Sequence, residues 1–482
     1  MIKCKLTKTN KKSQEEKRMY QLINDILTQF KEKIKREKTW RWFVVIILGL
    51  MMRKEQRGVT SIISGLGIEP KYYHTMLHFF RSKAYKVEEL YEKWVEVALK
   101  YAVVIEIRGR LVLLGDHIKV AKEGLRMPMV QVHHQSSENV GKAEYIEGHI
   151  YGQISAVITN GTDSRAMAMA AELQESAVKT GGDTLIEQTV KLAGEVTKNA
   201  KRAAICVLDA YFCSGTTFAT ADGVVDESGA RMLEIVTRAK SNTVAYRDPV
   251  AKDNTKAGRP RKYGEKVKLS GLFGDKTVNF SSATMLLYGK SKEVHYLCRD
   301  LFWKPADRKI RFVLAKIGTS TIVLMSSDRR LSSQEIITLY SYRFKIETGF
   351  DDQKNDMGGF AYHFWTDALP KRKRNADSVA PPTDDISIAK ISDAKQAIHA
   401  WVCLSIIATG ILSIIGFSYS RLIWNHFPGF IKTVRSRTPS VATTKLAFAH
   451  LLPALLPSLS ALDAFVFIPN LLRVFDSFAL AA

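Results

Sequence analysis

The chain has 482 residues, enough for about two to four domains, and 46% of them are hydrophobic, which is ordinary for a protein with a sizeable core. It carries 71 Lys and Arg against 48 Asp and Glu, a net charge of +23. Such an excess favours a polyanionic partner, nucleic acid first and an anionic membrane surface second. The five cysteines form no Cys-x-x-Cys pair, which argues against a disulfide framework or a cysteine-based zinc site and for a reducing compartment.

The first hundred residues are predicted to be helical and basic. Apolar residues between Ile23 and Ile34 recur at an amphipathic helical spacing, and residues 1–60 hold 16 Lys and Arg against 6 Asp and Glu. Residues 59–81 are typical of a helix, a glycine-containing turn and a second helix. This order is compatible with a helix-turn-helix whose second member enters a major groove, although helices joined by glycine also occur in other α-domains.

The next part alternates strands and helices, as an α/β core does. Short apolar runs end abruptly in Asp116 and Asp209, and runs of this kind are typical of buried strands. Further strands are predicted at 128–133 and 146–158, and a helix near 186–196. A carboxylate at the end of a buried strand lies at the rim of the sheet, where ligands bind in open α/β folds. For either Asp alone, a turn or a helix cap is the simpler interpretation.

From about 242 to 325 the pattern changes to short β-rich stretches with Gly and Pro between them, which predicts an all-β insertion. Within it, Arg259, Arg261 and Lys262 surround a Gly-Arg-Pro core. Extended basic arms of this type suit a narrow minor groove, and a basic surface turn is an equally good interpretation.

Tyr340, Arg343, Glu347 and Lys354 are separated by three, four and seven residues. On one continuous α-helix, at about 100° per residue, all four would fall within an arc of roughly 60°. A carboxylate flanked by cations suits a metal-dependent site that acts on a phosphate backbone. The alternative is a solvated charged stripe.

This Tyr-x2-Arg-x3-Glu-x6-Lys pattern, with Asp116 and Asp209 upstream, resembles the signature of DDE transposases of bacterial insertion sequences. Similar segments also surround both aspartates and lead into Glu347, so that the resemblance covers roughly residues 40 to 425. It implies a ribonuclease H-like sheet with an all-β insertion. It also implies three ligands for two Mg²⁺ ions, with Mn²⁺ able to substitute: Asp116, Asp209 and Glu347. Tyr340, Arg343 and Lys354 are implied to contact DNA near the cleaved end.

The resemblance implies an enzyme that cleaves the ends of its mobile element and joins the 3′ ends to target DNA. The expected partners are double-stranded DNA, as terminal inverted repeats and target, and a second copy of the chain on that DNA. The expected location is cytoplasmic and nucleoid-associated. Joining exchanges one phosphodiester for another, and the chain has no Gly-x4-Gly-Lys-Ser/Thr loop for nucleotide hydrolysis. The alternatives are a domesticated, catalytically silent DNA-binding descendant and, more remotely, a basic membrane-associated protein.

One segment has two interpretations. Residues 396–420 contain no Lys, Arg, Asp or Glu, so a hydropathy window predicts a membrane span. A helix that is hydrophobic on all sides also occurs in the cores of large proteins. Because the resembling family places an apolar helix after its signature, a buried helix and no membrane association are expected.

The fold class predicted is therefore α/β, a mixed sheet with flanking helices, preceded by a helical DNA-binding domain and followed by a helical tail. The predicted division is 1–105 (DNA binding), 106–241 (core, first part), 242–325 (β-rich insertion), 326–424 (core, second part, with the signature helix) and 425–482 (tail).

Overall fold

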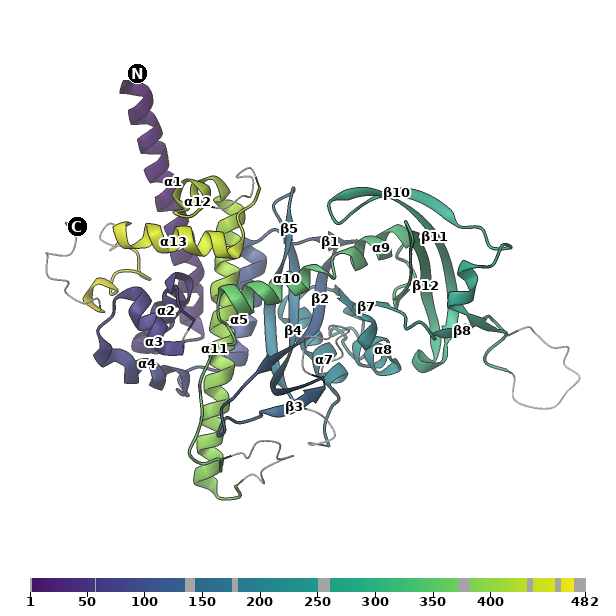
Figure 1. Ribbon diagram of the computed structural model, residues 1–482, viewed down its shortest axis with the longest axis horizontal. Helices are drawn as coiled ribbons and strands as arrows, with labels where there is room; N and C mark the ends of the chain where they lie inside the picture. Colours follow the sequence, from purple (N-terminus) through teal and green to yellow (C-terminus); the bar gives the residue numbers. More distant parts are fainter. Residues whose placement is uncertain are drawn as a thin grey trace, which may run out of the picture.

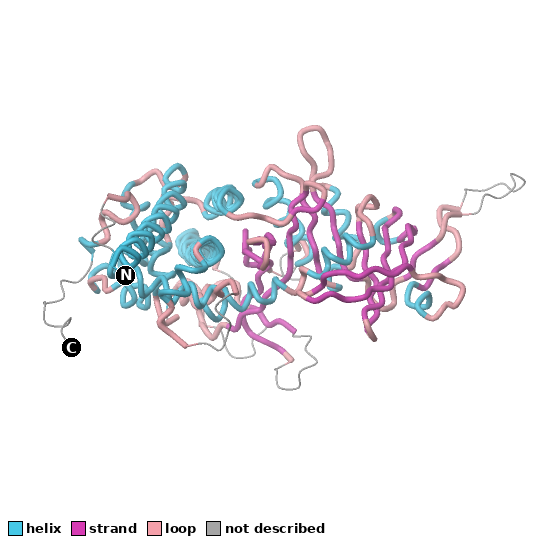
Figure 2. Tube along the Cα trace, turned by 90° about the horizontal axis from the view of Figure 1, so that it is seen from above, coloured by secondary structure: helices cyan, strands magenta, loops and turns pink. Residues whose placement is uncertain are grey.

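The computed structural model describes residues 2–56, 58–134, 144–175, 181–249, 261–371, 382–430, 437–455 and 461–471. Helices gather at one end of an elongated molecule, and a large mixed sheet with helices beside it fills the rest (Figures 1 and 2). The chain is thus a mixed α/β protein with N-terminal helices and a C-terminal helical region, as the sequence predicts.

The first hundred residues are helical, which confirms the prediction for this part. The helices described there are α1 (Ile2–Gln29), η1 (Phe30–Glu32), α2 (Glu37–Met52), α3 (Gly58–Leu66), η2 (Pro70–Tyr72), α4 (Tyr73–Phe80) and α5 (Val87–Tyr101). Helix α2 is apolar on all sides, and its residues from Phe43 to Met52 are all buried. Such a helix has to be surrounded by others, and α3, α4, α11 and α13 pack around it.

A single sheet runs through the middle of the described chain. Its strands are β1 (Glu106–Ile107), β2 (Arg110–Ala121), β3 (Gln131–His134), β4 (Tyr145–Thr159), β5 (Ser164–Gln174), β6 (Ala204–Leu208), β7 (Leu233–Arg238), β8 (Val244–Tyr246), β9 (Lys266–Lys268), β10 (Ser281–Leu287), β11 (Lys290–Trp303), β12 (Arg308–Ile317) and β13 (Ser320–Ser326). The main order is β3-β4-β2-β6-β7-β13-β12-β11-β8-β9; β1 pairs with β2, β5 with β4, and β10 with β11. Strands β2, β6 and β7 are parallel neighbours, and the other pairs are antiparallel.

Strands β8 to β13 come from the region predicted to be an all-β insertion. Strand β13 pairs with β12 on one side and with β7 on the other, so these strands extend the sheet of the core. The division into domains at these boundaries stays a prediction.

The helices beside the sheet are α7 (Leu185–Asn199), η3 (Ala210–Phe212), α8 (Gly215–Asp222), η4 (Leu269–Phe273), η5 (Lys304–Ala306), α9 (Ser333–Ser341), α10 (Lys345–Asp351) and the π-helix η6 (Asp352–Asp356). A capping box starts α7: the Thr184 hydroxyl accepts from the Glu187 amide, and the Glu187 carboxylate accepts from the Thr184 amide.

The C-terminal region contains α11 (Asp385–Ser418), α12 (Ser420–His426), α13 (Val441–Leu455) and η8 (Pro469–Leu471). Its last described segment packs back on the first helices: the Ala464 amide donates to Asn24 Oδ1 (3.0 Å), and the rings of Trp40 and Phe467 lie 6.0 Å apart. The sequence does not predict this role of the tail.

Helix α11 is long and apolar enough to cross a membrane, with a mean hydropathy of 2.2 over its most apolar window. In the structure 94% of that window is buried, and α2, α5, α13 and β5 surround it. The packing is close: a Cβ at Gly410 would lie 2.0 Å from the Trp94 ring. The helix therefore has the position expected of a core helix.

Two local predictions are wrong. The strand that contains Asp116 does not end there, because β2 continues to Ala121 through antiparallel pairing with β4. The signature is not one continuous α-helix, because α9 ends at Ser341. The amides of Arg343, Lys345, Ile346 and Glu347 then bond to carbonyls three residues back, as in a 3₁₀-helix. The predicted arc of roughly 60°, which assumes about 100° per residue, therefore does not hold.

Candidate active site

Asp116 and Asp209 lie side by side on neighbouring parallel strands. The last pair in the β2–β6 register joins Leu114 to Val207, and each aspartate lies two residues beyond its member of that pair. Residues at matched positions of a parallel pair point to the same face of a sheet, on strands about 4.8 Å apart. Past this level β6 has ended, whereas β2 goes on beside β4. Both carboxylates thus stand where the parallel pairing stops.

Gly115 permits the close approach of these strands. A Cβ at this position would lie 2.7 Å from Leu208 Cδ2 and 3.0 Å from Ile154 Cδ1. Leu208 is itself fully buried, so a side chain at Gly115 would force the side chains of Leu208 and Ile154 to move within a packed core. The glycine next to Asp116 therefore helps to set the spacing between the two carboxylates.

The environment of the two aspartates differs. Burial and, after it, the nearby Asp209 carboxylate raise the pKa of Asp116 to about 6, while the His117 amide and Arg343 act in the opposite direction. Asp209 accepts a hydrogen bond from the Tyr211 amide (2.9 Å) and so caps the short helix η3. The cap leaves its second oxygen available. Asp209 thus acts as the helix cap that the sequence allows, and its second oxygen stays free to bind a ligand.

Arg343 joins the third candidate carboxylate to the first. Its Nη1 donates to Asp116 Oδ2 (3.1 Å), and its Nη2 forms an ion pair with Glu347. Only 19% of the Arg343 side chain is exposed, against 49% for Glu347. The tight 3₁₀ turn between α9 and α10 carries Arg343, and the bridge spans two parts of the chain that lie 227 residues apart. Arg343, which the resemblance expects to contact DNA, is therefore paired with two carboxylates in the structure.

Tyr340 lies close to the same group. Burial raises its pKa to about 12, while the charges of Arg343 and Arg238 oppose that shift and the charge of Asp209 adds to it. Lys354, by contrast, is exposed on the π-helix η6, beyond the end of α10. The structure thus gathers Tyr340, Arg343 and Glu347 around the aspartates and leaves Lys354 at the surface.

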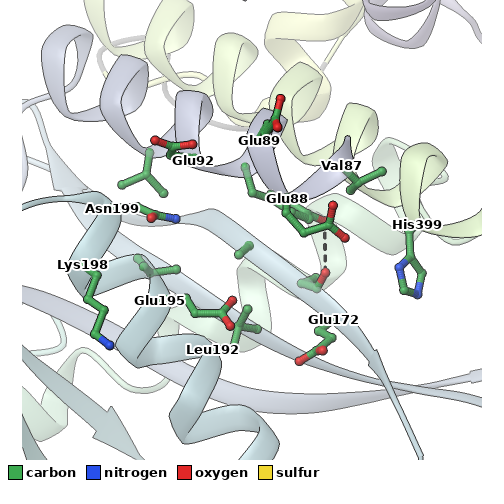
Figure 3. Close-up of a pocket in the computed structure, with 15 residues that line it drawn as sticks. Val87, Glu88, Glu89, Glu92, Glu172, Leu192, Glu195, Lys198, Asn199 and His399 are labelled. Atoms are coloured by element: carbon green, nitrogen blue, oxygen red, sulfur yellow. Dashed lines mark hydrogen bonds between the residues drawn. The ribbon is translucent and has the colours of Figure 1, made fainter. Parts of the chain in front are cut away.

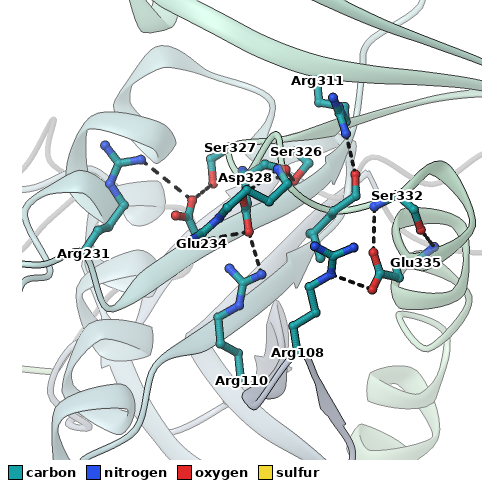
Figure 4. A network of polar contacts seen from close by, with 12 residues as sticks. Arg108, Arg110, Arg231, Glu234, Arg311, Ser326, Ser327, Asp328, Ser332 and Glu335 are labelled. Carbon is teal, nitrogen blue, oxygen red and sulfur yellow. Dashed lines mark hydrogen bonds and ion pairs between the residues drawn. The ribbon is translucent and has the colours of Figure 1, made fainter.

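A polar network holds the start of α9 against the sheet (Figure 4). Arg110 at the start of β2 pairs with Asp328 (2.6 Å), just after β13, and Arg108 pairs with Glu335 in the first turn of α9 (2.8 Å). Ser332 and Glu335 form a capping box at the helix start. Because α9 leads directly to Tyr340 and Arg343, these contacts fix the direction from which both side chains reach the aspartates.

His117 adds no charge to the site. It follows Asp116 on β2 and so points to the opposite face of the sheet, where it stacks on Phe212 and its Nε2 lies 2.7 Å from the Thr189 hydroxyl. Burial lowers its pKa to about 4, so the ring is neutral at pH 7. The His117 ring therefore does not lower the pKa of Asp116 as a charged imidazolium would.

The basic residues of the predicted minor-groove arm lie elsewhere. Arg259 is outside the described residues. Arg261 is exposed, and Lys262 pairs with Asp307 beside β8 and β9. These strands end the sheet order, β8 five strands and β9 six strands away from β6, or about 24 and 29 Å at about 4.8 Å per strand. The structure does not bring Arg261 and Lys262 to the carboxylates.

A separate pocket of about 380 Å³ lies between α5, β5, α7 and α11 (Figure 3). Glutamates line it, and burial, followed by the neighbouring carboxylates of Glu195 and Asp183, raises the pKa of Glu172 to about 7. Accumulated negative charge repels phosphates. This pocket is therefore not part of a surface for DNA.

Comparison with known families gives the class of this site. Residues 29–284 match the model of the DDE superfamily endonuclease family, a range that contains Asp116 and Asp209 and ends before Glu347. The chain belongs to this family of nuclease- or transposase-type enzymes, whose substrate is DNA. No curated protein matches the chain.

Nucleases of this family generally use divalent metals. Within the part of the chain that the structure describes, no group of three or more His, Cys, Asp or Glu side chains is close enough together to hold an ion. The aspartate pair nevertheless fits one: it offers two hard oxygen donors, the Asp209 charge raises the pKa of Asp116, and a divalent cation would relieve this repulsion. In the structure, the guanidinium of Arg343 supplies part of the positive charge that such a cation would bring.

Proposed function

We propose that this protein is a DNA transposase of the insertion-sequence type, with a ribonuclease H-like catalytic core. It cleaves the ends of its element and joins the 3′ ends to target DNA. The observation that carries the proposal is the matched position of Asp116 and Asp209 on parallel strands, with Arg343 linking Asp116 to Glu347. A charged stripe without function would not converge on two aspartates of which one lies inside a buried strand and the other directly after its parallel neighbour.

In the proposed site Asp116, Asp209 and Glu347 hold two Mg²⁺ ions, or Mn²⁺ in their place. Two such ions activate the attacking oxygen and stabilise the leaving oxygen of an in-line phosphoryl transfer. Glu347 completes the ligand set when the bridge through Arg343 opens, because that guanidinium occupies the space between two of the carboxylates. Arg343 is then free to take a phosphate oxygen of the DNA.

The remaining residues position the strand that is cut. Tyr340 stays protonated at any pH near neutrality, since its pKa is raised to about 12, and so offers a hydrogen-bond donor beside Asp209. Lys354 stands on the surface, where it contacts the phosphate backbone of the DNA as a mobile point charge. The protein acts as a homodimer that pairs the two element ends, on the DNA of the cytoplasm.

The test is a nicking assay on a plasmid that carries the DNA flanking the coding region on both sides. Asp116→Asn, Asp209→Asn and Glu347→Gln are each expected to abolish Mg²⁺-dependent nicking while DNA binding persists. Asp226→Asn is the matched control, since Asp226 is an exposed carboxylate that only accepts bonds from the Ser228 and Ala230 segment. Wild-type nicking by one of the three variants removes that residue from the site. A wild-type protein that binds DNA and never nicks it would favour the catalytically silent descendant.

A further inference from the structure

An exposed tryptophan stands on an ordered extended segment outside the carboxylate site. Between Tyr362 and Thr366 burial alternates: Tyr362, Phe364 and Thr366 are buried, whereas His363 and Trp365 are exposed, Trp365 by 57%. Phe364 packs on the rings of Phe80 and Trp401. The backbone is therefore anchored from below, and it presents the indole of Trp365 to solvent in a fixed place.

Further contacts hold this segment to the end of β2. The Thr366 amide donates to the Arg126 carbonyl (3.1 Å), and the buried ammonium of Lys122 donates to the Phe360 and Tyr362 carbonyls. The Lys122 ammonium also lies 3.6 Å from the centre of the Tyr362 ring. An aromatic side chain on a backbone restrained in this way gives up little conformational entropy when it stacks on a ligand.

Trp365 separates two hollows. One, of about 430 Å³, extends towards Tyr73 and Arg81 of the α4 region and Lys390 of α11; the other, of about 840 Å³, is lined by Leu125, Arg126 and Lys371. Both volumes are in the range of sites for small molecules. His363 and Trp365 border both hollows. The indole is thus accessible from two sides, as a stacking platform has to be.

The lining is cationic on balance. The two hollows contain four cations and three carboxylates: Arg81, Arg126, Lys371 and Lys390 against Glu123, Asp367 and Asp393. Lys122 also lines one hollow, but its nitrogen is bonded to the Phe360 and Tyr362 carbonyls and burial lowers its pKa to about 7. Lys390 pairs with Asp367 (3.3 Å). Arg126 also lines the larger hollow, and its buried Nε atom has no hydrogen-bond partner among the described residues.

An aromatic platform ringed by cations is the arrangement that binds single-stranded nucleic acid. Bases stack on the ring and phosphates approach the cations, with little dependence on sequence. A duplex hides the faces of its bases, so this surface fits an unpaired strand. Ala121, which lines the larger hollow, lies five residues along β2 from Asp116, about 17 Å at about 3.3 Å per residue. A strand that leaves the cut end unpaired can span that distance with a few nucleotides.

We propose that Trp365, with Arg126 and Lys371, binds an unpaired DNA strand next to the site of cleavage by stacking a base on the indole. The proposal rests on the proposed function, because it assigns the strand to the DNA that the carboxylates cut. The surface around Trp365 thereby binds a part of the substrate that the carboxylate site does not contact.

The experiment measures the binding of a fluorescent oligothymidylate and of a duplex of equal length by the full-length protein, by anisotropy over a range of salt. Trp365→Ala is expected to weaken oligothymidylate binding by about 5- to 150-fold, with an unchanged salt slope and nearly unchanged duplex binding. Trp365→Phe should restore most of the affinity. Arg126→Ala should instead lower the salt slope by about 0.7. Phe430→Ala is the matched control, an aromatic with 93% exposure away from these hollows, and it should leave all values unchanged.

A second readout excludes a merely structural effect. An oligonucleotide with 5-iodouracil should crosslink on irradiation to the peptide that contains Trp365 in the wild-type protein. Three results would each overturn the proposal. They are wild-type affinity in Trp365→Ala, crosslinks only to peptides without Trp365, and a Trp365→Ala variant that loses self-association but keeps strand binding. A protein that binds and crosslinks the oligonucleotide but never nicks DNA would retain this inference and refute the transposase.

Discussion

Asp116→Asn should make the metal-free protein more stable as well as inactive. Burial and the Asp209 charge raise the pKa of Asp116 from 3.8 to about 6 in the folded protein. The folded state therefore disfavours the ionised carboxylate, and only 19% of this side chain is exposed. A shift of about two pKa units corresponds to about 3 kcal/mol of lost stability at pH 7. Asparagine keeps the shape of the group without its charge, so the variant should recover about 1–3 kcal/mol.

The sign of the pH dependence follows from the same shift. Because the folded-state pKa is raised, the folded protein binds more protons than the unfolded chain between about pH 4 and 6. The wild-type protein should lose this contribution as the pH rises through that window. The advantage of Asp116→Asn should consequently be largest above pH 6 and should decrease towards pH 4.

Calorimetry of both proteins without divalent metal, at several pH values, measures the effect. For a chain of this length about 1 kcal/mol moves Tm by roughly 1 °C, so the expected gain above pH 6 is about 1–3 °C. Adding Mn²⁺ should reverse the order, since an ion at about 100 times its Kd stabilises the wild-type protein by about 2.7 kcal/mol. Asp226→Asn is the control of opposite sign: hydrogen bonds from Ser228 and Ala230 lower the pKa of Asp226, so its loss should not stabilise. A destabilised Asp116→Asn protein at pH 8 would refute the reasoning.

Three further outcomes are expected. Gly115→Ala should reduce nicking and lower Tm, because its Cβ would lie 2.7 Å from Leu208 Cδ2; activity equal to wild type, measured in the nicking assay, would exclude the close approach as a requirement. Arg343→Ala should raise the affinity for Mn²⁺ in calorimetric titration by removing the competing guanidinium, and should weaken DNA binding; unchanged metal affinity would mean that the bridge does not compete. Lys354→Ala should lower the slope of log affinity against log salt by about one unit with Tm unchanged, and an unchanged slope with a lower Tm would make Lys354 structural.

The sequence by itself determined that the two candidate aspartates lie at buried strands. Apolar runs that end at Asp116 and Asp209 predict buried strands with carboxylates where they meet solvent, and both aspartates lie in or beside buried strands. The helical periodicity of the first hundred residues and the short β-rich stretches of residues 242–325 were also sufficient to predict helices and strands there. These features depend on local patterns of burial, which recur every two or 3.6 residues and are therefore visible in the chain itself.

Only the tertiary structure decided how these features fit together. Asp116 and Asp209 lie side by side only because of the register of β2 against β6, and the bridge from Arg343 to Asp116 joins residues 227 positions apart. Strand β5, rich in Ala and Met, carries no strand pattern of its own and forms because β4 offers it a free edge. The apolar composition of α11 fits a membrane or a core equally well, and its packing against α2, α5 and α13 places it inside the protein. Register, long-range ion pairs and burial are set by distant parts of the chain, so no local pattern could have given them.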